Sequence, residues 1–480
     1  MKSSYGISQY PDAKEIYSQL DNLLSQDIRP IKKEAMDKYL SWFDDNCSDS
    51  KEIITEAQKY IPGGVQHNLA FNHPFPLVFT KAEGAWLFDK DGNKYIDFLQ
   101  AGGPTVLGSN YKPVQEKVID LIKECGPSTG LFHEYELKLA KEVCRHFPSV
   151  DMFRMLGSGT EAVMAAVRIA RLATGKKKII KMGGAYHGWS DQMVYGLRIA
   201  GTGRFEAHGI PRATTRHTQE FTPNSLPALE RKLRMNKIRG GTAAVILEPI
   251  GPESGTRPLD IEFNKSVREL CTKYGALLIL DEVVSAFRIG LGGAQGYFDV
   301  KPDLTIFGKV IAGGYPSAGG LGGSKDLMAY LAAGIQGAKK RALVGGTMAA
   351  NPLSSAAGYY TLKEIESQEA CQKAGAAGDR LTQGLQDIIK AKSLPYVAYN
   401  QGSICHLETT GVMLLKMQLN IPKLLKQVKS RKHMMEEMGA AYMAEGIVTL
   451  AGSRMYTSMA DTDEIIDEAL NRFERVLSKV

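Results

Sequence analysis

A carboxylate and a lysine stand at the ends of two short apolar segments of this chain. The segment at residues 276–280 reads ALLIL and stops at Asp281, and the segment at residues 304–307 reads LTIF and is followed by Gly308 and Lys309. Short apolar runs of this kind are typical of strands buried in a parallel sheet. Because parallel strands end at one edge, where such sheets bind their ligands, we expect Asp281 and Lys309 to lie together there.

An amine beside a buried carboxylate suits the chemistry of pyridoxal phosphate. The lysine amine forms a Schiff base with the cofactor aldehyde, and the carboxylate keeps the pyridine nitrogen protonated so that the ring accepts electrons. Each residue alone is weak evidence, because strand ends often carry an Asp and because a lysine after a strand is usually a solvated loop residue. The interpretation gains weight from three glycine-rich segments elsewhere in the chain.

Two of these segments lie at the predicted starts of helices, where backbone N–H groups bind phosphate. Residues 156–162 read LGSGTEA, and the hydroxyls of Ser158 or Thr160 either bind a phosphate or merely cap the helix. Residues 345–347 read GGT before another predicted helix, and Thr347 has the same two interpretations. Each segment taken alone is an ordinary helix cap, whereas the two together favour a phosphate site.

The third segment, residues 183–189 (GGAYHGW), follows an apolar run that predicts a strand at residues 178–182. An aromatic side chain in such a loop can stack on a planar cofactor, which gives Tyr186 a candidate role. The alternative is an ordinary surface turn with a half-buried tyrosine. His187 is not a candidate metal ligand, because no second ligand stands at a suitable spacing.

The elements that must position these residues alternate between helix and strand from about residue 110 to residue 350. Besides the strands already named, the pattern predicts a strand at residues 243–247, which ends at Glu248, and a helix at residues 261–274. Alternation of this kind predicts an α/β fold with a mostly parallel sheet flanked by helices.

The length of 480 residues and the changes of pattern along it predict four sections. We expect an N-terminal helical arm over residues 1–60, a hairpin segment of a small domain over 61–110, a large cofactor-binding α/β domain over 111–350, and a small C-terminal α+β domain over 351–480. The helices predicted outside the large domain are residues 13–24, 31–43, 354–365, 372–391 and 463–477. The strands of the predicted hairpin meander are residues 77–80, 85–88 and 95–99.

Composition limits the classes of function. The chain is 44% hydrophobic and 23% charged, as in an ordinary globular protein, and its net charge of +7 includes no long basic block, which argues against a nucleic-acid partner. The six cysteines have neither zinc nor disulfide spacing. No secretory signal and no apolar run of membrane-span length is present. These features predict a cytoplasmic protein with small-molecule partners.

In their combination and order, these motifs resemble the class III pyridoxal-phosphate aminotransferases of fold type I. They are most similar to the branch of glutamate-1-semialdehyde 2,1-aminomutase and the β-amino-acid aminotransferases. The resemblance covers the chain from about Tyr60 to its end. It rests on the motifs PGGV, DxDGxxYID, GSGTEA, YHG, LEP, LDEV, FGK with IAGG, and GT with NPL.

The resemblance implies roles for particular residues. Lys309 would be the Schiff-base lysine and Asp281 the partner of the pyridine nitrogen, while Val283 and Tyr186 would cover the two faces of the ring. The further cofactor-binding residues that the resemblance implies are Ser158, Gly159, Thr160, His187 and Glu248, with Thr347 reaching the phosphate in the neighbouring subunit of a homodimer.

Two substrate-binding features of the semialdehyde aminomutases are missing here. The family has an arginine shortly after PGGV, where this chain reads VQHNL at residues 65–69, and the mutase's acidic residue near the C-terminal end has no counterpart in AGSRMY at residues 451–456. His67 and Arg454 are the candidate substrate residues in these segments. Arg454 is a candidate because a guanidinium forks onto a carboxylate, and its alternative is a surface arginine.

The resemblance therefore implies an enzyme that moves an amino group from an amino acid or amine to an oxo acid in two ping-pong half-reactions, with Lys309 acting as base and then as acid. The alternative is an aminomutase or amino-acid racemase, in which both half-reactions occur on one substrate. A binding protein without catalysis is disfavoured because Asp281 and Lys309 are both present, and a nicotinamide-dependent dehydrogenase because no GxGxxG follows the first strand.

Overall fold

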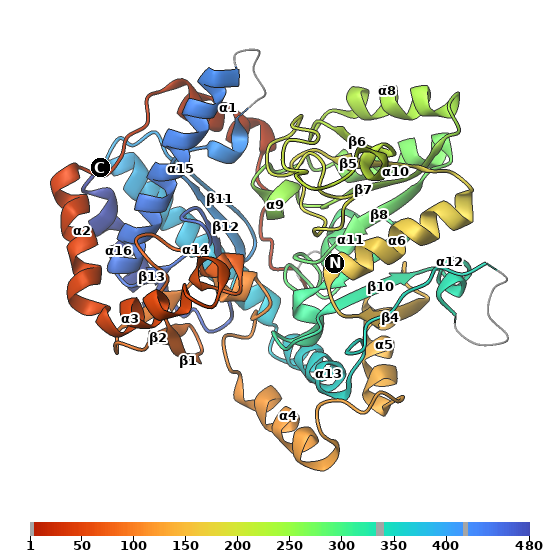
Figure 1. The fold of residues 1–480 in the computed structure, drawn as a ribbon, viewed down its shortest axis with the longest axis horizontal. Helices are drawn as coiled ribbons and strands as arrows, with labels where there is room; N and C mark the ends of the chain where they lie inside the picture. Colours follow the sequence, from red (N-terminus) through yellow and green to blue (C-terminus); the bar gives the residue numbers. More distant parts are fainter. Residues whose placement is uncertain (1–3, 333–339, 416–420) are drawn as a thin grey trace. The chain divides into compact units, whose positions relative to one another are not determined.

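The computed structural model describes residues 4–332, 340–415 and 421–480. The chain divides into two compact units (Figure 1). The first unit comprises Met1–Tyr5 and Lys112–Glu369, and the second comprises Gly6–Tyr111 and Ala370–Val480.

A seven-stranded sheet runs through the described part of the first unit, in the order β4-β10-β9-β8-β7-β5-β6. Its strands are β4 (Met152–Leu156), β5 (Lys178–Met182), β6 (Thr218–Phe221), β7 (Thr242–Leu247), β8 (Leu277–Asp281), β9 (Leu304–Gly308) and β10 (Gly319–Gly323). The strands from β9 to β6 pair in parallel, whereas β10 is antiparallel to both of its neighbours. The predicted α/β class with a mostly parallel sheet is confirmed.

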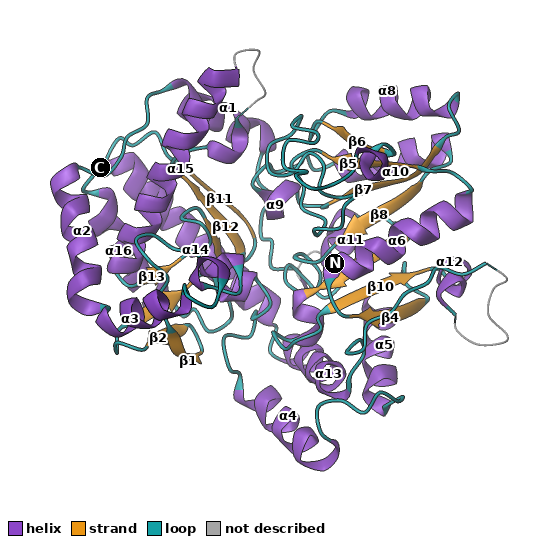
Figure 2. Cartoon of the chain, in the orientation of Figure 1, coloured by secondary structure: helices purple, strands orange, loops and turns teal. Residues whose placement is uncertain are grey.

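Helices such as α6 and α10 pack on this sheet (Figure 2), and the others belong to the same unit. They are α4 (Lys112–Cys125), α5 (Glu134–His146), α6 (Gly159–Thr174), α7 (Arg212–Thr215), α8 (Leu226–Lys237), α9 (Pro252–Gly255), α10 (Phe263–Tyr274), α11 (Gly293–Phe298), η5 (Lys309–Ala312), α12 (Lys325–Met328), η6 (Ala329–Leu331) and α13 (Pro352–Ser367). Helix α6 begins after Ser158, whose hydroxyl accepts the N–H of Glu161, and ends at Gly175, whose φ of 68° is left-handed. Its buried face packs against isoleucines of the sheet.

Helix α13 belongs to the first unit, although the sequence predicted that the small C-terminal domain begins at residue 351. It packs against α4 and α5 of the same unit. Small buried residues on α13, among them Ala356, Ala357 and Gly358, permit this close approach. The chain therefore re-enters the second unit only at Ala370.

The second unit combines helices with two small sheets. Its helices are α1 (Ala13–Ser25), α2 (Lys33–Asn46), α3 (Ser48–Ala57), η2 (Pro62–Gly64), η3 (Asn68–Ala70), η4 (Gln100–Gly102), α14 (Ala370–Ala391), η7 (Val412–Leu414), α15 (Ile421–Ala444) and α16 (Asp463–Leu477). One sheet contains β1 (Phe79–Glu83), β2 (Trp86–Asp89), β3 (Lys94–Asp97) and β13 (Ile447–Val448), and the other contains β11 (Val397–Gln401), β12 (Ile404–Glu408) and β14 (Arg454–Tyr456). The antiparallel β1, β2 and β3 form the predicted hairpin meander.

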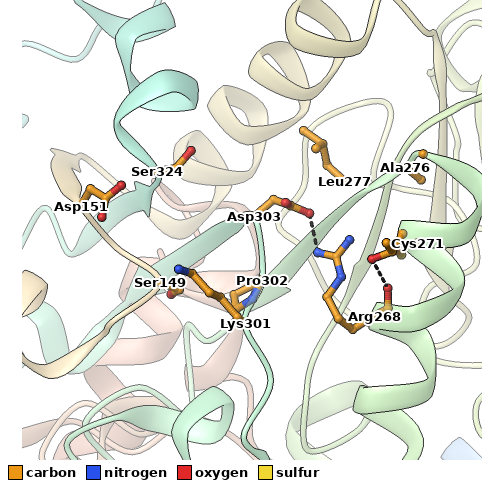
Figure 3. A pocket seen from close by; sticks show the side chains of 12 residues that line it. Ser149, Asp151, Arg268, Cys271, Ala276, Leu277, Lys301, Pro302, Asp303 and Ser324 are labelled. Atoms are coloured by element: carbon orange, nitrogen blue, oxygen red, sulfur yellow. Dashed lines mark hydrogen bonds and ion pairs between the residues drawn. The ribbon is translucent and has the colours of Figure 1, made fainter.

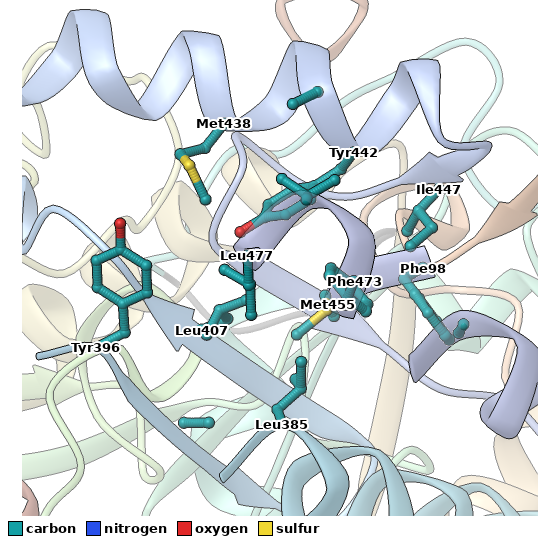
Figure 4. Packing of buried hydrophobic residues seen from close by; sticks show 14 of the residues in the cluster. Phe98, Leu385, Tyr396, Leu407, Met438, Tyr442, Ile447, Met455, Phe473 and Leu477 are labelled. Carbon is teal, nitrogen blue, oxygen red and sulfur yellow. The ribbon is translucent and has the colours of Figure 1, made fainter. Parts of the chain in front are cut away.

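The core of the second unit joins its N-terminal and C-terminal segments. Phe98, Tyr442 and Phe473 pack together there, and Tyr442 meets Phe473 edge-on with ring centroids 5.0 Å apart (Figure 4). Ile16 and Leu20 of α1 belong to the same buried cluster, so the predicted N-terminal arm packs within this unit. Among the described helices of both units, none has the length and apolar character needed to span a membrane.

Candidate active site

Two neighbouring strands of the first unit each deliver a carboxyl group to the same edge and face of the sheet. Ile246 of β7 pairs in register with Ile279 of β8, and both pack in the cluster that includes α6. Side chains two positions apart along a strand share a face, so Glu248 and Asp281 follow these isoleucines on the α6 side. Both carboxyl groups are buried, with exposed fractions of 7% and 5%.

The carboxylate of Asp281 pairs with a histidine from the loop after β5. His187 Nδ1 lies 2.7 Å from Asp281 Oδ2, and the N–H of Val283 donates to Oδ1 at 3.1 Å. Because a carboxylate only accepts hydrogen bonds, His187 carries its proton on Nδ1. Burial lowers the pKa of His187, while the hydrogen bond to Asp281 works in the opposite direction. His187 thus holds the orientation of Asp281, and its own Nε2 is buried without a partner among the described residues.

Glu248 accepts three backbone N–H groups. Tyr186 and Glu253 donate to Oε1, each at 3.0 Å, and Ser254 donates to Oε2 at 2.8 Å. Glu253 and Ser254 have left-handed φ values of 52° and 58°, which turn their N–H groups toward the carboxyl group. Burial raises the pKa of Glu248 to about 8, and the charges of Asp281 and Glu253 add to this effect. The N–H groups of Ser254 and Tyr186 act in the opposite direction, because they favour the ionised carboxylate.

Lys309 follows β9, the parallel neighbour of β8, and Asp281 pairs in register with Ile306 of that strand. The sheet thus brings the predicted lysine and the predicted acid to adjacent strand ends. Lys309 has a left-handed φ of 49°, a conformation that costs a non-glycine residue about 1–2 kcal/mol. Such strain persists where the surrounding structure fixes the residue, which is common at functional sites.

The N-terminus of α6 presents the predicted phosphate-binding segment. The hydroxyl of Ser158 accepts the N–H of Glu161 at 3.2 Å, and the carboxylate of Glu161 accepts the N–H of Gly157 at 2.9 Å. Gly159 and Thr160 form the first turn, whose N–H groups have no acceptor within the helix. Together with the partial positive charge of the helix end, these donors suit a phosphate.

Val283 lies between this helix start and the end of β9. A Cβ atom on Gly159 would lie 2.9 Å from Val283 Cγ2, and one on Gly308 would lie 2.8 Å from Val283 Cγ1. Any larger residue at either glycine would displace the valine. Tyr186, by contrast, is half exposed, so its ring is free to cover a bound ligand.

Thr347 is exposed in the single chain. A Cβ atom on the preceding Gly346 would lie 3.3 Å from Oε2 of Glu161, so this loop runs beside the α6 N-terminus of its own chain. Leu343 and Met348, on either side of Thr347, are also exposed, by 74% and 48%. The predicted contact of Thr347 with a neighbouring subunit stays a prediction.

The two candidate substrate residues lie in the second unit, whereas the site described above lies in the first. Their roles in binding substrate therefore stay predictions. His67 is exposed, and its Nδ1 accepts the N–H of Leu69 at 3.1 Å in a short turn. Arg454 starts β14, is half-buried and pairs in register with His406 of β12.

A separate depression lies at the amino ends of the central strands (Figure 3). Arg268 and Asp303, two of its lining residues, form an ion pair at 2.6 Å, and Asp303 also accepts the N–H of Leu278. Burial raises the pKa of the neighbouring Cys271 to about 12, which leaves its thiol unreactive at neutral pH.

Lys181 on β5 is a charged residue close to Glu248 and Asp281 that the sequence did not single out. It is fully buried and donates hydrogen bonds to Ala185 O and Met193 O. The signal was present in the strand sequence KIIKM, where a second lysine shares a face with the inward-pointing Ile179.

The donor set of the first unit fits pyridoxal phosphate. An amine and a buried carboxylate lie at adjacent strand ends, and donors for a phosphate lie at the α6 N-terminus. Gly159 and Gly308 lack the side chains that would displace Val283. The buried Nε2 of His187 is a further polar atom at the site for which the chain supplies no partner in its described part.

Comparison with known proteins agrees with this fit. Residues 69–477 match the family "Aminotransferase class-III". The glutamate-1-semialdehyde 2,1-aminomutase of Legionella pneumophila (strain Corby) is 40% identical over 362 residues, which are 74% of this chain and 82% of that protein. The glutamate-1-semialdehyde 2,1-aminomutase 2 of Brevibacillus brevis is 35% identical over 444 residues, or 90% of this chain and 99% of the relative.

A solved structure shares the fold over nearly its whole length. An omega-transaminase from Sphaerobacter thermophilus superimposes with a TM-score of 0.79 at 25% identity, and the match covers 91% of this chain and 99% of that one. Members of the family are enzymes that depend on pyridoxal phosphate. This chain belongs to the class III aminotransferases, a family of pyridoxal-phosphate-dependent enzymes with fold type I.

Proposed function

We propose that this enzyme transfers an amino group from an amino acid or amine to an oxo acid, as a homodimer. The observation that carries the proposal is the placement of Lys309 and Asp281 at adjacent strand ends, with Asp281 held by His187 at 2.7 Å. When bound, pyridoxal phosphate supplies an aldehyde that takes up the amine and a ring that accepts the electron pair of the broken bond.

The residues of the first unit divide the remaining work. Lys309 would hold the cofactor through its Nζ atom, and the same amine, when free, would carry a proton as base and then as acid. Asp281 would keep the pyridine nitrogen protonated, because a buried carboxylate stabilises an adjacent cation. His187 keeps Asp281 in place through the Nδ1–H donor.

Binding and orientation fall to residues that carry no charge. Ser158, Gly159 and Thr160 would hold the phosphate at the α6 N-terminus. Val283 and Tyr186 would cover the two faces of the ring, which would align the reacting atoms and exclude water.

The homodimer is supported by exposed apolar residues near these groups. Leu343 and Met348 flank Thr347, and Trp189, two residues after His187, is 75% exposed. Large apolar side chains that are exposed in the single chain would lose contact with water in a subunit interface. In the dimer, Thr347 of each chain would bind the phosphate in the partner's site.

An aminomutase is the second candidate, and the names of the curated relatives favour it. The sequence VQHNL at residues 65–69, with no arginine, separates this chain from the semialdehyde aminomutases and favours another substrate.

One experiment distinguishes the two candidates. The enzyme is loaded with pyridoxal phosphate and mixed with a panel of amino acids and amines, with and without an oxo acid. A transferase converts stoichiometric cofactor to its amine form with a donor alone and turns over only when the oxo acid is added. Turnover of glutamate-1-semialdehyde without any acceptor would establish the aminomutase instead. If no donor changes the visible absorbance of bound cofactor, the transferase proposal is wrong.

A further inference from the structure

A lysine without solvent access lies beside the carboxyl groups of the site. Lys181 on β5 has an exposed fraction of 0% and pairs in register with Ile246 of β7. Ile179, two residues earlier on the same face, belongs to the apolar cluster under α6. A lysine at such a position costs free energy unless its ammonium group is well compensated.

Two backbone carbonyls compensate the Lys181 ammonium group. Its Nζ donates to Ala185 O at 2.9 Å and to Met193 O at 3.3 Å. These two carbonyls stand at the ends of the segment that carries Tyr186 and His187. One buried side chain therefore fastens both ends of the loop that supplies the N–H to Glu248 and the imidazole to Asp281.

Acidic groups on several neighbouring segments raise the pKa of this ammonium group. Glu220 on β6 pairs in register with Lys181, and its carboxylate accepts the N–H groups of Gly201 and Gly203 at 2.9 and 2.8 Å. The other acids that raise the pKa of Lys181 are Glu248, Glu253 and Asp281. Burial outweighs them and brings the pKa of Lys181 to about 8. In return, the charge of Lys181 lowers the pKa of His187.

We propose that Lys181 is a positioning residue of this active site. Its ammonium group fixes the loop that brings His187 to Asp281, and its positive charge offsets the buried carboxyl groups around it. The inference rests on the proposed function only in assuming that pyridoxal phosphate binds at Lys309 and Asp281.

Three variants of Lys181 separate its charge from its hydrogen bonds. Lys181→Met removes both, Lys181→Gln keeps an N–H donor without the charge, and Lys181→Arg keeps both. The matched control is Lys178→Met, which removes a lysine from the other end of the same strand, where Nζ donates to Arg239 O at the surface. Each variant is purified and titrated with pyridoxal phosphate, and its visible spectrum is followed across pH. Circular dichroism checks the fold.

We expect Lys181→Met to bind pyridoxal phosphate on the order of tenfold more weakly, the loss typical of a hydrogen bond made by a charged group. The pH midpoint of the visible absorbance should rise by about half a unit to one unit in Lys181→Met and Lys181→Gln, because a nearby positive charge is removed. Lys181→Arg should keep the wild-type midpoint, and Lys178→Met should change neither quantity.

If Lys181 were purely structural, its replacement would change thermal stability and leave the pH midpoint of the visible absorbance unchanged. The proposal is overturned if Lys181→Gln and Lys181→Arg share the wild-type midpoint, or if all Lys181 variants match Lys178→Met. If Lys181→Met does not fold, the pH midpoints of Lys181→Gln and Lys181→Arg still test the proposal. Failure of the proposed function would look different, because the wild-type enzyme itself would then show no visible band with pyridoxal phosphate.

Discussion

Replacing Asp281 with Asn removes one buried charge and little volume. The amide oxygen can still accept the N–H of Val283, but the amide nitrogen then faces His187 Nδ1, so the imidazole must move its proton to Nε2 to keep the 2.7 Å hydrogen bond. A neutral amide also cannot hold a proton on the pyridine nitrogen. Breaking a buried charge pair costs about 3–5 kcal/mol. Since each 1.4 kcal/mol is a factor of ten, kcat should fall roughly a hundredfold to several thousandfold.

The assay measures amino transfer at saturating donor and acceptor, beside a titration with pyridoxal phosphate. Asp281→Asn should retain cofactor with reduced affinity while kcat collapses. The matched control is Asp303→Asn, an acid of the same sheet that pairs with Arg268 at the amino ends of the strands. That variant should lose stability and keep kcat. Wild-type kcat in Asp281→Asn would show that the carboxylate is a strand-end residue without a role in the chemistry.

Further predictions concern the other site residues. Lys309→Ala should abolish turnover and the visible band of bound cofactor, and turnover at the wild-type rate would contradict its role. The pKa of Glu248 is about 8 in the folded protein and 4.5 ordinarily, so the folded state binds more protons than the unfolded state between these pH values. The contribution of Glu248 to stability is therefore full below about pH 4.5 and is lost as the pH rises to 8. Denaturant unfolding of Glu248→Gln should therefore depend less steeply on pH between 5 and 8, by up to about 1.4 kcal/mol per pH unit, and equal slopes would refute this. Thr347→Ala should weaken cofactor binding and uncouple cofactor from dimer stability, and a wild-type dimer whose dissociation ignores cofactor would contradict the intersubunit contact. Arg454→Ala should raise KM for amino acids far more than for simple amines, with Arg454→Lys recovering only part; equal effects on both substrate types would make it structural.

Strands with apolar faces on both sides were predictable from sequence. The strands predicted at residues 178–182, 243–247, 276–280 and 304–307 correspond to β5, β7, β8 and β9, with differences of one residue at some ends. In a chain that alternates helix and strand, short runs rich in Ile, Leu and Val have few structural alternatives to a buried strand. The meander and the helices α1, α2, α10, α14 and α16 were predictable for the same reason, from spacing of apolar residues.

Strand β10 was not predictable, because its sequence GGLGG resembles a loop. The glycines there serve close packing: a Cβ atom on Gly319 would lie 2.3 Å from the backbone of Ser158, and one on Gly320 would lie 2.5 Å from Phe153. Tertiary contact, which the local sequence does not contain, selects the strand. Helix α15 was also missed, and α3 was predicted only as part of the helical arm over residues 1–60.

The site, too, was predictable only in part. Asp281 and Lys309 could be predicted because each is a polar residue at the end of an apolar strand. The hydrogen bond between His187 and Asp281 joins residues 94 positions apart, and the segment of Glu253 and Ser254 closes on Glu248 through left-handed backbone. Neither arrangement has a local pattern that would predict it.

Trapping the cofactor on the chain tests the central claim most directly. The enzyme is loaded with pyridoxal phosphate, reduced with borohydride, digested and mapped by mass spectrometry. We expect the reduced cofactor to be attached to the peptide containing Lys309, and we expect Lys309→Ala to yield no modified peptide at that position. Stoichiometric attachment to a different lysine, Lys181 included, or no attachment to the wild-type enzyme, would contradict it.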